Sequence, residues 1–420
     1  MEDIVFGLDI GTTKICALVG AVRNRELRII GLGMQPSAGM RKGMIVDVPA
    51  ASVAVAAAVE AAEHTSGYEL SQALVSIAGE HISSTNNRGL VAINRNDTGV
   101  TTQDIDRALE TAQAIPIPNN RQIIHLIPRH YTIDDHAGVR QPLGMHGYRL
   151  EIEAHIVTAA TSALQNLTHC TDTVGIKAEE TVLNALASAE AVLEPAEKEM
   201  GVLIADIGGG TTDLALYKQG TVWHTHVIPI GGHHITNDIA IGLRAPYEVA
   251  EKVKIQYGDC RPADIDPDFV FTVEPFGGEK IQVGRQDLAQ VIEARVEEIF
   301  HMILKDIQQS GYDEYLPAGI VLTGGTALLR GITDVAERVL NVPARVATPK
   351  NLVGLVDSLH SPAYATSVGL LRWAIMDHHR YQPHSQSSSQ WGRRVGNILR
   401  TLLPGSWPAV GQQTCLLENL

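Results

Sequence analysis

The order of apolar and polar residues along the chain predicts strands that alternate with helices. Apolar runs of strand length occupy residues 4–10, 14–20, 26–34, 73–78, 201–207, 213–218, 220–229 and 318–323. Helical periodicity marks residues 50–64, 102–114, 162–174, 177–193, 235–241, 246–257, 285–309 and 363–376. Strands and helices mixed in this way are typical of an α/β fold.

Between residues 82 and 158 the pattern changes to short alternating segments at 89–94, 122–128, 131–134 and 149–158. They surround the predicted helix 102–114, whose start at Thr101 and Asp104 resembles a capping sequence. A structureless loop of this length would be unusual inside a compact domain. We therefore expect residues 82–158 to form a small inserted α+β subdomain.

Two stretches combine an apolar strand, the triplet Asp-Ile-Gly, a small polar turn and a second apolar strand. They read LDIGTTKICALVG at 8–20 and ADIGGGTTDLALY at 205–217. Glycines let backbone N–H groups close on an anion, because no Cβ stands in the way. The two copies predict a duplicated fold with two domains, each presenting a phosphate hairpin to a shared cleft. The alternative is a chance match of two unrelated loops.

Three further features support a nucleotide site. The stretch AGIVLTGGTALLRG at 318–331 predicts a strand, a Thr-Gly-Gly turn and a helix, which would bring backbone close to a base or ribose. The pair Gly231 and Gly232 precedes a helix, and a helix N-terminus suits a phosphate. Asp206 and Asp213 offer carboxylates for a hydrated Mg²⁺.

Composition narrows the function classes. The chain has 420 residues, of which 45% are hydrophobic and 19% charged, and its net charge of -14 disfavours general nucleic-acid binding. Four cysteines without CxxC spacing argue against a zinc site or a disulfide framework. Because the N-terminus lacks a secretion signal and no apolar run reaches the length of a membrane span, we expect a cytoplasmic protein.

The C-terminal part reads as a polar linker, residues 377–390, followed by an amphipathic helix. Its apolar residues fall on one helical face: Trp391, Val395, Ile398, Leu399, Leu402 and Leu403. Its arginines lie away from that face: Arg393, Arg394 and Arg400. Docking to a partner groove and packing back on the core remain open, but basic residues on an acidic protein favour an anionic membrane surface, at about 1 kcal/mol per arginine.

The three glycine-rich elements resemble the phosphate-1, phosphate-2 and adenosine motifs of the actin, sugar-kinase and heat-shock ATPase superfamily. Within it, the chain resembles the FtsA family of bacterial cell-division proteins over nearly its whole length. The features that carry this resemblance are the loop 39–47, the insertion after Gly79, the segment IHLIP at 124–128, and AGIVLTGG at 318–325. The resemblance implies an actin-like duplicated ATPase fold around a nucleotide cleft, with an insertion of the FtsA type, named subdomain 1C.

The resemblance also implies domain boundaries. Subdomain 1A would comprise residues 1–81, 159–198 and the final helix 363–376, and subdomain 1C residues 82–158. Subdomain 2A would comprise residues 199–228 and 317–362, and subdomain 2B residues 229–316. The flexible linker 377–390 and the membrane-targeting tail 391–420 would follow.

Site roles follow from the resemblance in the same way. The cofactors would be ATP and Mg²⁺, with Asp9 and Asp206 holding the metal through water. The phosphates would be bound from the first domain by Gly11, Thr12, Thr13 and Lys14. From the second domain they would be bound by Gly208, Gly209, Gly210, Thr211, Thr212 and Asp213, with Gly231 and Gly232 nearby. The ribose and base would meet Glu251, Lys254, Gly324, Gly325 and Thr326, although Glu251 and Lys254 also fit an ordinary helix-surface pair.

One departure from the hydrolysing members concerns the attacking water. Many of them carry Glu-Pro or a glutamine in the helix after the insertion, where this chain reads EETVLN at 179–184. The candidate substitutes are Glu180 and Asp213. We therefore expect ATP binding with at most slow hydrolysis.

By resemblance, the protein would anchor FtsZ filaments to the inner face of the cytoplasmic membrane at the septum, self-associate, and recruit later division proteins. The 229–316 region would contact FtsZ, and the insertion would serve polymer and partner contacts. Two alternatives remain: a PilM-like scaffold of a pilus or secretion system, and a kinase or phosphatase on the same fold.

Overall fold

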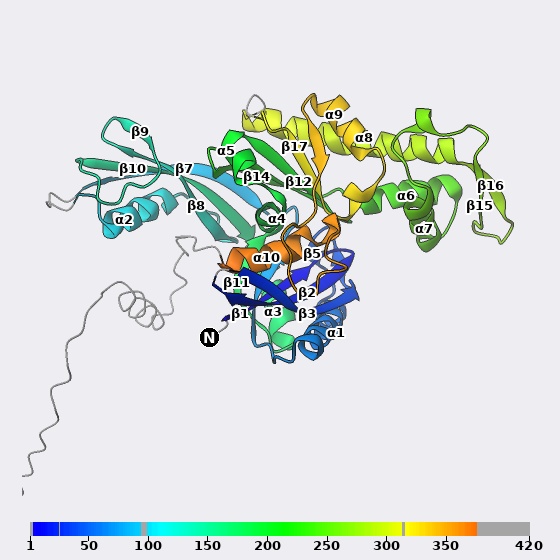
Figure 1. Ribbon diagram of the computed structural model, residues 1–420, viewed down its shortest axis with the longest axis horizontal. Helices are drawn as coiled ribbons and strands as arrows, with labels where there is room; N and C mark the ends of the chain where they lie inside the picture. The colour runs from blue at the N-terminus through cyan, green and yellow to red at the C-terminus, as the bar shows by residue number, and fades with distance from the viewer. Residues whose placement is uncertain (1–2, 25, 94–98, 313–315, 376–420) are drawn as a thin grey trace, which may run out of the picture. The chain divides into compact units, whose positions relative to one another are not determined.

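A computed structural model describes residues 3–24, 26–93, 99–312 and 316–375 of the chain. These residues lie in one compact unit, residues 1–381 (Figure 1). The linker and the amphipathic tail predicted from residue 377 onward lie outside the described residues.

Two five-stranded sheets have the same topology. The first has the strand order β11-β6-β1-β2-β3 and the second the order β18-β17-β12-β13-β14. In each sheet three antiparallel strands in sequence order are extended by two parallel strands. The first sheet is built from β1 (Asp3–Ile10), β2 (Lys14–Arg23), β3 (Glu26–Pro36), β6 (Gln72–Ile77) and β11 (Lys177–Leu183). The second is built from β12 (Val202–Ile207), β13 (Thr212–Lys218), β14 (Thr221–Ile228), β17 (Ile320–Thr323) and β18 (Ala344–Val346). The duplication predicted from the two Asp-Ile-Gly stretches is confirmed.

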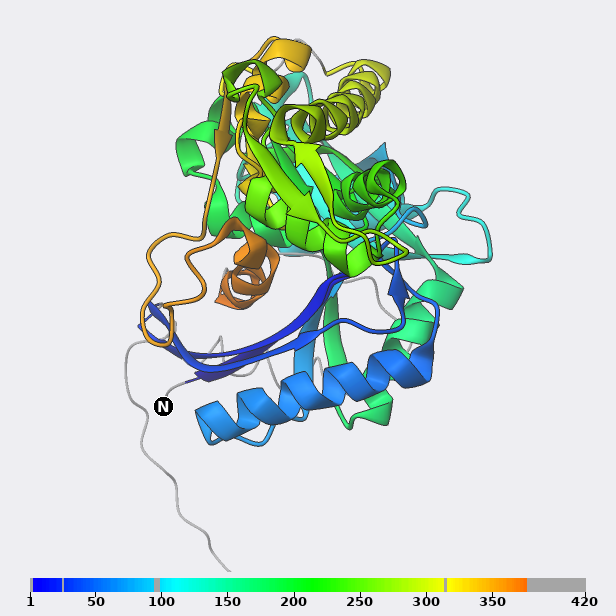
Figure 2. The same cartoon turned by 90° about the vertical axis from the view of Figure 1, so that its right-hand side faces the viewer.

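Helices cover both faces of the first sheet. On one face lie α1 (Val48–Ser66) and α3 (Thr161–Thr173), and on the other α10 (Ala365–Ile375), as Figure 2 shows. Helix α1 begins where the Asp47 carboxylate accepts a hydrogen bond from the Ala50 N–H, at 3.0 Å, and ends at Gly67 with φ of 75°. Helix α4 (Asn184–Val192) packs against α10 and against β12 and β13, so these two helices join the sheets through one apolar core.

We call the part of the molecule built on the first sheet the first half, and the part built on the second sheet the second half. The remaining elements lie mostly in the second half. They are α5 (Pro195–Met200), α6 (Gly232–Leu243), α7 (Tyr247–Tyr257), α8 (Arg285–Ser310) and α9 (Ile332–Leu340), with the hairpin β15 (Val270–Val273) and β16 (Ile281–Gly284). Short 3-10 turns lie at Pro262–Asp264, Gly325–Leu328 and Pro362–Tyr364, and a two-residue pair, β4 (Met40–Arg41) and β5 (Met44–Ile45), lies in the loop before α1. Helix α8 is amphipathic as predicted, and its apolar side packs in the second core.

The insertion is an α+β unit with its own small core. Its sheet has the order β7-β10-β8-β9, from β7 (Ser83–Ala92), β8 (Arg121–Ile133), β9 (His136–Val139) and β10 (Arg149–Ala160), covered by α2 (Thr102–Gln113). The predicted capping box is present: Thr101 Oγ1 accepts from the Asp104 N–H at 3.3 Å, and the Asp104 carboxylate accepts from the Thr101 N–H at 2.9 Å.

The insertion also contacts the second half through buried polar groups. The ring of His155, on β10, is hydrogen-bonded to Asn86 Oδ1 at 2.7 Å and to Thr225 Oγ1, on β14, at 2.9 Å. The Arg129 guanidinium lies 4.0 Å from the centroid of the Trp223 ring and pairs with Glu153 at 2.6 Å. We call these residues the docking network; they tie the insertion to β14.

Two predicted elements are wrong. Residues 177–193 form a strand followed by a helix rather than one helix, because Lys177–Leu183 pairs in parallel with β6. The segments 122–128 and 131–134 are one continuous strand, β8, since Pro128 is accommodated opposite Ala154 at a register shift in its pairing with β10.

Candidate functional site

A cavity of about 390 Å³ lies between the turns of the two five-stranded sheets, a size typical of a small-molecule site. The predicted residues that line it are Asp9, Gly11, Thr12, Thr13, Lys14, Asp206, Gly208, Gly209, Gly210, Thr211, Asp213, Gly232, Glu251, Lys254, Gly324, Gly325 and Thr326. Thr212, Gly231 and Glu180 are the predicted residues outside this lining. The three glycine-rich elements, far apart in sequence, therefore meet at one place.

The first turn, between β1 and β2, is closed by a hydrogen bond from the Gly11 N–H to the Lys14 carbonyl, at 3.0 Å. Thr12 Oγ1 accepts a hydrogen bond from the Gly43 N–H at 3.1 Å, and this bond ties the loop 39–47 to the turn. The Lys14 ammonium donates to the Ala363 carbonyl and lies 4.7 Å from the centroid of the Tyr364 ring. Lys14 thus brings a positive charge to the cavity, where the neighbouring lining residues belong to glycine-rich turns.

The second turn, between β12 and β13, is closed by the Gly208 N–H donating to the Thr211 carbonyl, at 2.9 Å. The Gly208 carbonyl in turn accepts from the Gly232 N–H and from Thr326 Oγ1, both at 2.9 Å. This carbonyl therefore joins the second turn to the start of α6 and to the adenosine motif.

Thr212 and Gly231 support the turn instead of facing the cavity. The buried Thr212 hydroxyl donates to the Ile230 carbonyl at 2.9 Å. A Cβ on Gly231 would lie 2.5 Å from the Gly208 carbonyl oxygen, so glycine allows the backbones to approach. Neither residue belongs to the cavity lining, and their predicted contact with the phosphates stays a prediction.

Three buried carboxylates, those of Asp9, Asp206 and Asp213, line the cavity. Asp9 accepts hydrogen bonds from Ser76 Oγ at 3.0 Å and from Ser367 Oγ at 2.7 Å. Asp206 accepts from Ser188 Oγ and from Thr366 Oγ1. Burial, with Asp9 as a further cause, raises the pKa of Asp206.

Asp213 is the least satisfied of the three. Its Oδ2 accepts from Thr211 Oγ1 at 2.8 Å, whereas its buried Oδ1 has no partner among the described residues. Burial, and then the nearby charge of Asp206, raise the pKa of Asp213 well above its usual value. Carboxylate oxygens and water are the ligands that Mg²⁺ prefers, and a divalent cation would offset this repulsion. Among the described residues no three His, Cys, Asp or Glu side chains are arranged to hold a metal ion directly, so these carboxylates fit Mg²⁺ only where water carries the contact.

The end of the cavity beside the start of α6 is lined by Glu251 and Lys254 of α7. Lys254 pairs with Glu251 at 2.7 Å, donates to Thr236 Oγ1 at 2.8 Å and to the Gly232 carbonyl at 3.1 Å. Burial lowers the pKa of Lys254, while the Glu251 carboxylate opposes this shift. The pair therefore lies in the cavity wall, and its contact with ribose and base stays a prediction.

Apolar side chains also line this end, and the sequence did not mark them. They are Ile255, Leu328 and Leu329. Ile255 and Leu328 are 75% and 60% exposed. Because they lie on a helix, a turn and a loop, no sequence periodicity links them.

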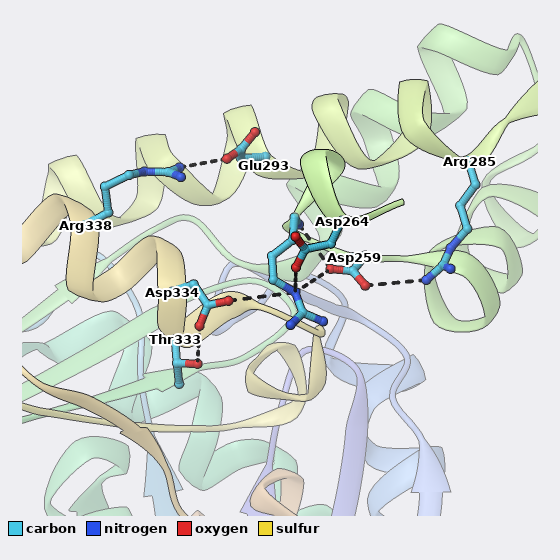
Figure 3. A network of polar contacts seen from close by, with 8 residues as sticks. Asp259, Asp264, Arg285, Glu293, Thr333, Asp334 and Arg338 are labelled. Atoms are coloured by element: carbon cyan, nitrogen blue, oxygen red, sulfur yellow. Dashed lines mark hydrogen bonds and ion pairs between the residues drawn. The ribbon is translucent and has the colours of Figure 1, made fainter. Parts of the chain in front are cut away.

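A network of ion pairs links the loop after α7 to α8 and α9 (Figure 3). The Arg261 Nε contacts Asp259 at 3.2 Å and Asp334 at 3.8 Å, and Asp259 also pairs with Arg285 at 3.5 Å. Next to it, the Cys260 N–H donates to the carbonyl of Arg330, which lines the cavity, at 2.8 Å. These contacts therefore connect α7 and α8 to α9 beside a residue of the cavity lining.

The structure places Asn184, and not Glu180, in the lining of the cavity. Glu180 lies on β11, where its carboxylate accepts from Trp373 Nε1 at 3.0 Å. Asn184 is the first residue of α4 and lines the cavity, and its buried Oδ1 has no partner among the described residues. The strand-to-helix change at residues 183–184 is the signal that was missed.

The predicted membrane-facing residues from Trp391 to Leu403 lie outside the described residues. Among the described helices, none has the length and apolar character that a membrane span requires.

Comparisons with known proteins agree with this architecture. The family model described as "Cell division protein FtsA" matches residues 203–369, and that described as "SHS2 domain inserted in FTSA" matches residues 79–158. Among solved structures, a PilM-PilN type IV pilus biogenesis complex has a TM-score of 0.66 at 16% identity, covering 88% of this chain and 98% of that chain. ADP-bound MreB5 of Spiroplasma citri has a TM-score of 0.50 at 16% identity, covering 89% and 98%. These two likenesses show the actin-like fold alone.

Curated relatives named cell division protein FtsA are much more similar in sequence. The protein of Pseudomonas aeruginosa is 42% identical over 375 residues, which cover 89% of each chain. That of Neisseria meningitidis serogroup B is 43% identical over 87% of this chain and 89% of its own. That of Escherichia coli (strain K12) is 34% identical over 96% of this chain and 95% of its own. An actin-like fold with this insertion and identity over most of the chain leads to one conclusion: the chain belongs to the FtsA family of cell-division proteins.

Proposed function

We propose that this cell-division protein binds ATP with Mg²⁺ in the cavity and uses the bound nucleotide to set its conformation and assembly. The observation that carries the proposal is the convergence of two glycine-rich turns, a third Gly-Gly turn and three buried carboxylates on one cavity of about 390 Å³. Bound MgATP would supply a γ-phosphate whose presence distinguishes two states of the cleft.

The roles of the chain's own residues follow from their positions. The turns at Gly11 and Gly208 present backbone N–H groups, and Lys14 adds a positive charge, which together suit phosphate oxygens. Asp9 and Asp206 would hold Mg²⁺ through water. Lys254, with Glu251, and the apolar wall would hold the ribose and base.

Turnover, where it occurs, should be slow. Asn184 and Asp213, which both line the cavity, would orient the attacking water. The side chain of asparagine is one methylene shorter than that of the glutamine that many hydrolysing members carry. We therefore propose a nucleotide-dependent assembly protein rather than an efficient ATPase.

We further propose that the protein self-associates, anchors FtsZ filaments to the inner face of the cytoplasmic membrane at the septum, and helps to recruit later division proteins. Family membership supports the division role. The apolar face and arginines of residues 391–403 support a peripheral membrane anchor. By family analogy, residues 229–316 would contact FtsZ, and residues 82–158 would contact partners and neighbouring copies.

Co-sedimentation with anionic liposomes tests the anchor. The full chain, with MgATP and FtsZ filaments, should carry FtsZ to the vesicles, whereas a chain that ends at Asp377 should not. A double variant, Leu399→Gln with Leu402→Gln, should behave like the truncated chain because it removes apolar contacts from one face. Asn397→Gln, on the polar side, is the matched control and should retain binding. Equal sedimentation of the full and truncated chains would contradict the anchor.

A further inference from the structure

The segment IHLIP at 124–128 has no role in the function proposed above. It lies in β8, where Ile123 is opposite Thr158 on β10 and His125 is opposite Val157, so Ile124 is an extra residue. Such a bulge re-aims the side chains that follow it. Here Ile124 packs against the apolar core that joins the two five-stranded sheets, while Leu126 lies in the insertion's own core.

The bulge directs His125 out of the insertion and into the first half. His125 is buried, and its Nε2 accepts a hydrogen bond from the Leu183 N–H at 3.0 Å. Its ring meets the Trp373 ring edge to face, with centroids 5.4 Å apart. Trp373 in turn donates to Glu180 on β11, so His125 belongs to a packed contact that includes the end of that strand.

Leu183 is the residue on which this contact acts. It ends β11 and is the N-cap of α4, and among the described residues no side chain caps this helix end. The next residue is Asn184, which lines the cavity and whose Oδ1 has no partner within the described part of the chain. The Leu183 N–H is therefore one residue away from a side chain of the cavity lining. An acceptor at this N–H therefore fixes the direction in which Asn184 leaves the strand.

We propose that His125 is a positioning residue of the nucleotide site: from the inserted subdomain, it holds Leu183 and thereby orients the Asn184 carboxamide. This inference rests on the proposed nucleotide function. It means that the insertion contributes to the cavity without lining it.

Three variants of the full chain separate positioning from packing. His125→Leu keeps bulk but removes the acceptor. His125→Asn introduces an amide, but the asparagine side chain is too short for its oxygen to reach the Leu183 N–H. His125→Gln places an oxygen near the position of Nε2 and is the conservative control. Thermal unfolding first establishes which variants are folded, and His125→Asn replaces His125→Leu if the latter is not.

The first readout requires no nucleotide. Hydrogen exchange at the Leu183 amide should be faster in His125→Leu and His125→Asn than in the unmodified chain, and near normal in His125→Gln. Unchanged exchange at this amide in folded His125→Leu and His125→Asn would overturn the proposal.

The second readout uses MgATP. The Kd for MgATP should change less than about threefold, while single-turnover hydrolysis should fall roughly tenfold to a hundredfold in the two disrupting variants, because misplacing a positioned group costs this much. Asn184→Ala should lower turnover similarly, and adding His125→Leu to it should have no further effect. Additive losses, equal loss in His125→Gln, or no turnover in the unmodified chain would overturn the positioning role. Failure of the unmodified chain to bind MgATP would instead overturn the proposed function itself.

Discussion

At the scale of single residues, position 231 requires a glycine because a side chain would clash with its neighbours, not because of its backbone conformation. Its φ of -170° is extended and open to any residue. A Cβ, however, would lie 2.5 Å from the Gly208 carbonyl oxygen and 2.8 Å from that of Gly209, both in the second phosphate turn. The glycine is therefore a spacer that lets α6 start against the turn.

We expect Gly231→Ala to push the turn away from the start of α6. The cost should be about 1–3 kcal/mol of unfolding free energy, the usual range for overpacking, with weaker MgATP binding. Thermal unfolding and calorimetric titration measure the two effects. Gly242→Ala is the matched control: a Cβ there meets nothing within 4 Å, so the helix α6 should gain up to about 1 kcal/mol. A Gly231→Ala protein with normal stability and affinity would contradict the spacer role.

At the scale of elements, the packing of α10 on α4 supports the site from behind. Gly369, on α10, lies against the Ala187 carbonyl, and a Cβ would overlap that oxygen. The same two helices supply Thr366 and Ser188, which donate to Asp206. Separating the helices should therefore disturb a carboxylate of the proposed cation site.

Gly369→Ala should lower the unfolding midpoint and also weaken Mg²⁺-dependent nucleotide binding. The stability loss should be on the order of 1–3 kcal/mol or more, because backbone rather than a flexible side chain must move. Comparison of Kd values with Mg²⁺ and with EDTA isolates the metal-dependent part. A variant that loses stability but keeps the full Mg²⁺ effect would show that the helix packing and the carboxylate are independent.

At the scale of the whole described unit, the insertion touches both halves. His125 contacts the first half, and the docking network around His155 contacts β14 of the second. Strand β14 leads directly to Ile230 and Gly231 at the second phosphate turn. The docking network therefore contacts a strand, β14, that ends next to the cavity.

The docking network should weaken in acid. Burial, with the charges of His224, Arg129 and His125 as lesser causes, lowers the pKa of His155 from 6.5 to about 3. Between these two values the unfolded chain binds a proton on His155 that the folded chain does not. The contribution of His155 to stability is therefore complete above pH 6.5 and is lost as pH falls toward 3.

Urea unfolding of the unmodified chain and of His155→Gln between pH 7.5 and 5 tests this. Glutamine keeps polar atoms but does not titrate, so the two curves of unfolding free energy should converge as pH falls. Below pH 6.5 their slopes should approach a difference of about 1.4 kcal/mol per pH unit, the value for one proton. Parallel curves would mean that His155 titrates alike in both states.

The sequence by itself determined the parts of this protein whose physics is local. The two Asp-Ile-Gly hairpins, the capping box at Thr101 and the amphipathic α8 depend on turn glycines, a cap and helical periodicity. Most of the predicted cavity residues sit on those glycine-rich turns, which is why the motifs found them.

Only the tertiary structure decided the rest, because it depends on partners far away in the chain. Residues 177–183 become a strand through pairing with β6, whose Gln72 lies opposite Lys177, and this moves the helix start to Asn184 and takes Glu180 away from the cavity. Gly231 faces a carbonyl that a different motif supplies. The apolar part of the cavity wall combines an α7 residue with others from the turn and loop after β17. Pairing and packing across such separations leave no local periodicity, so no reading of neighbouring residues could show them.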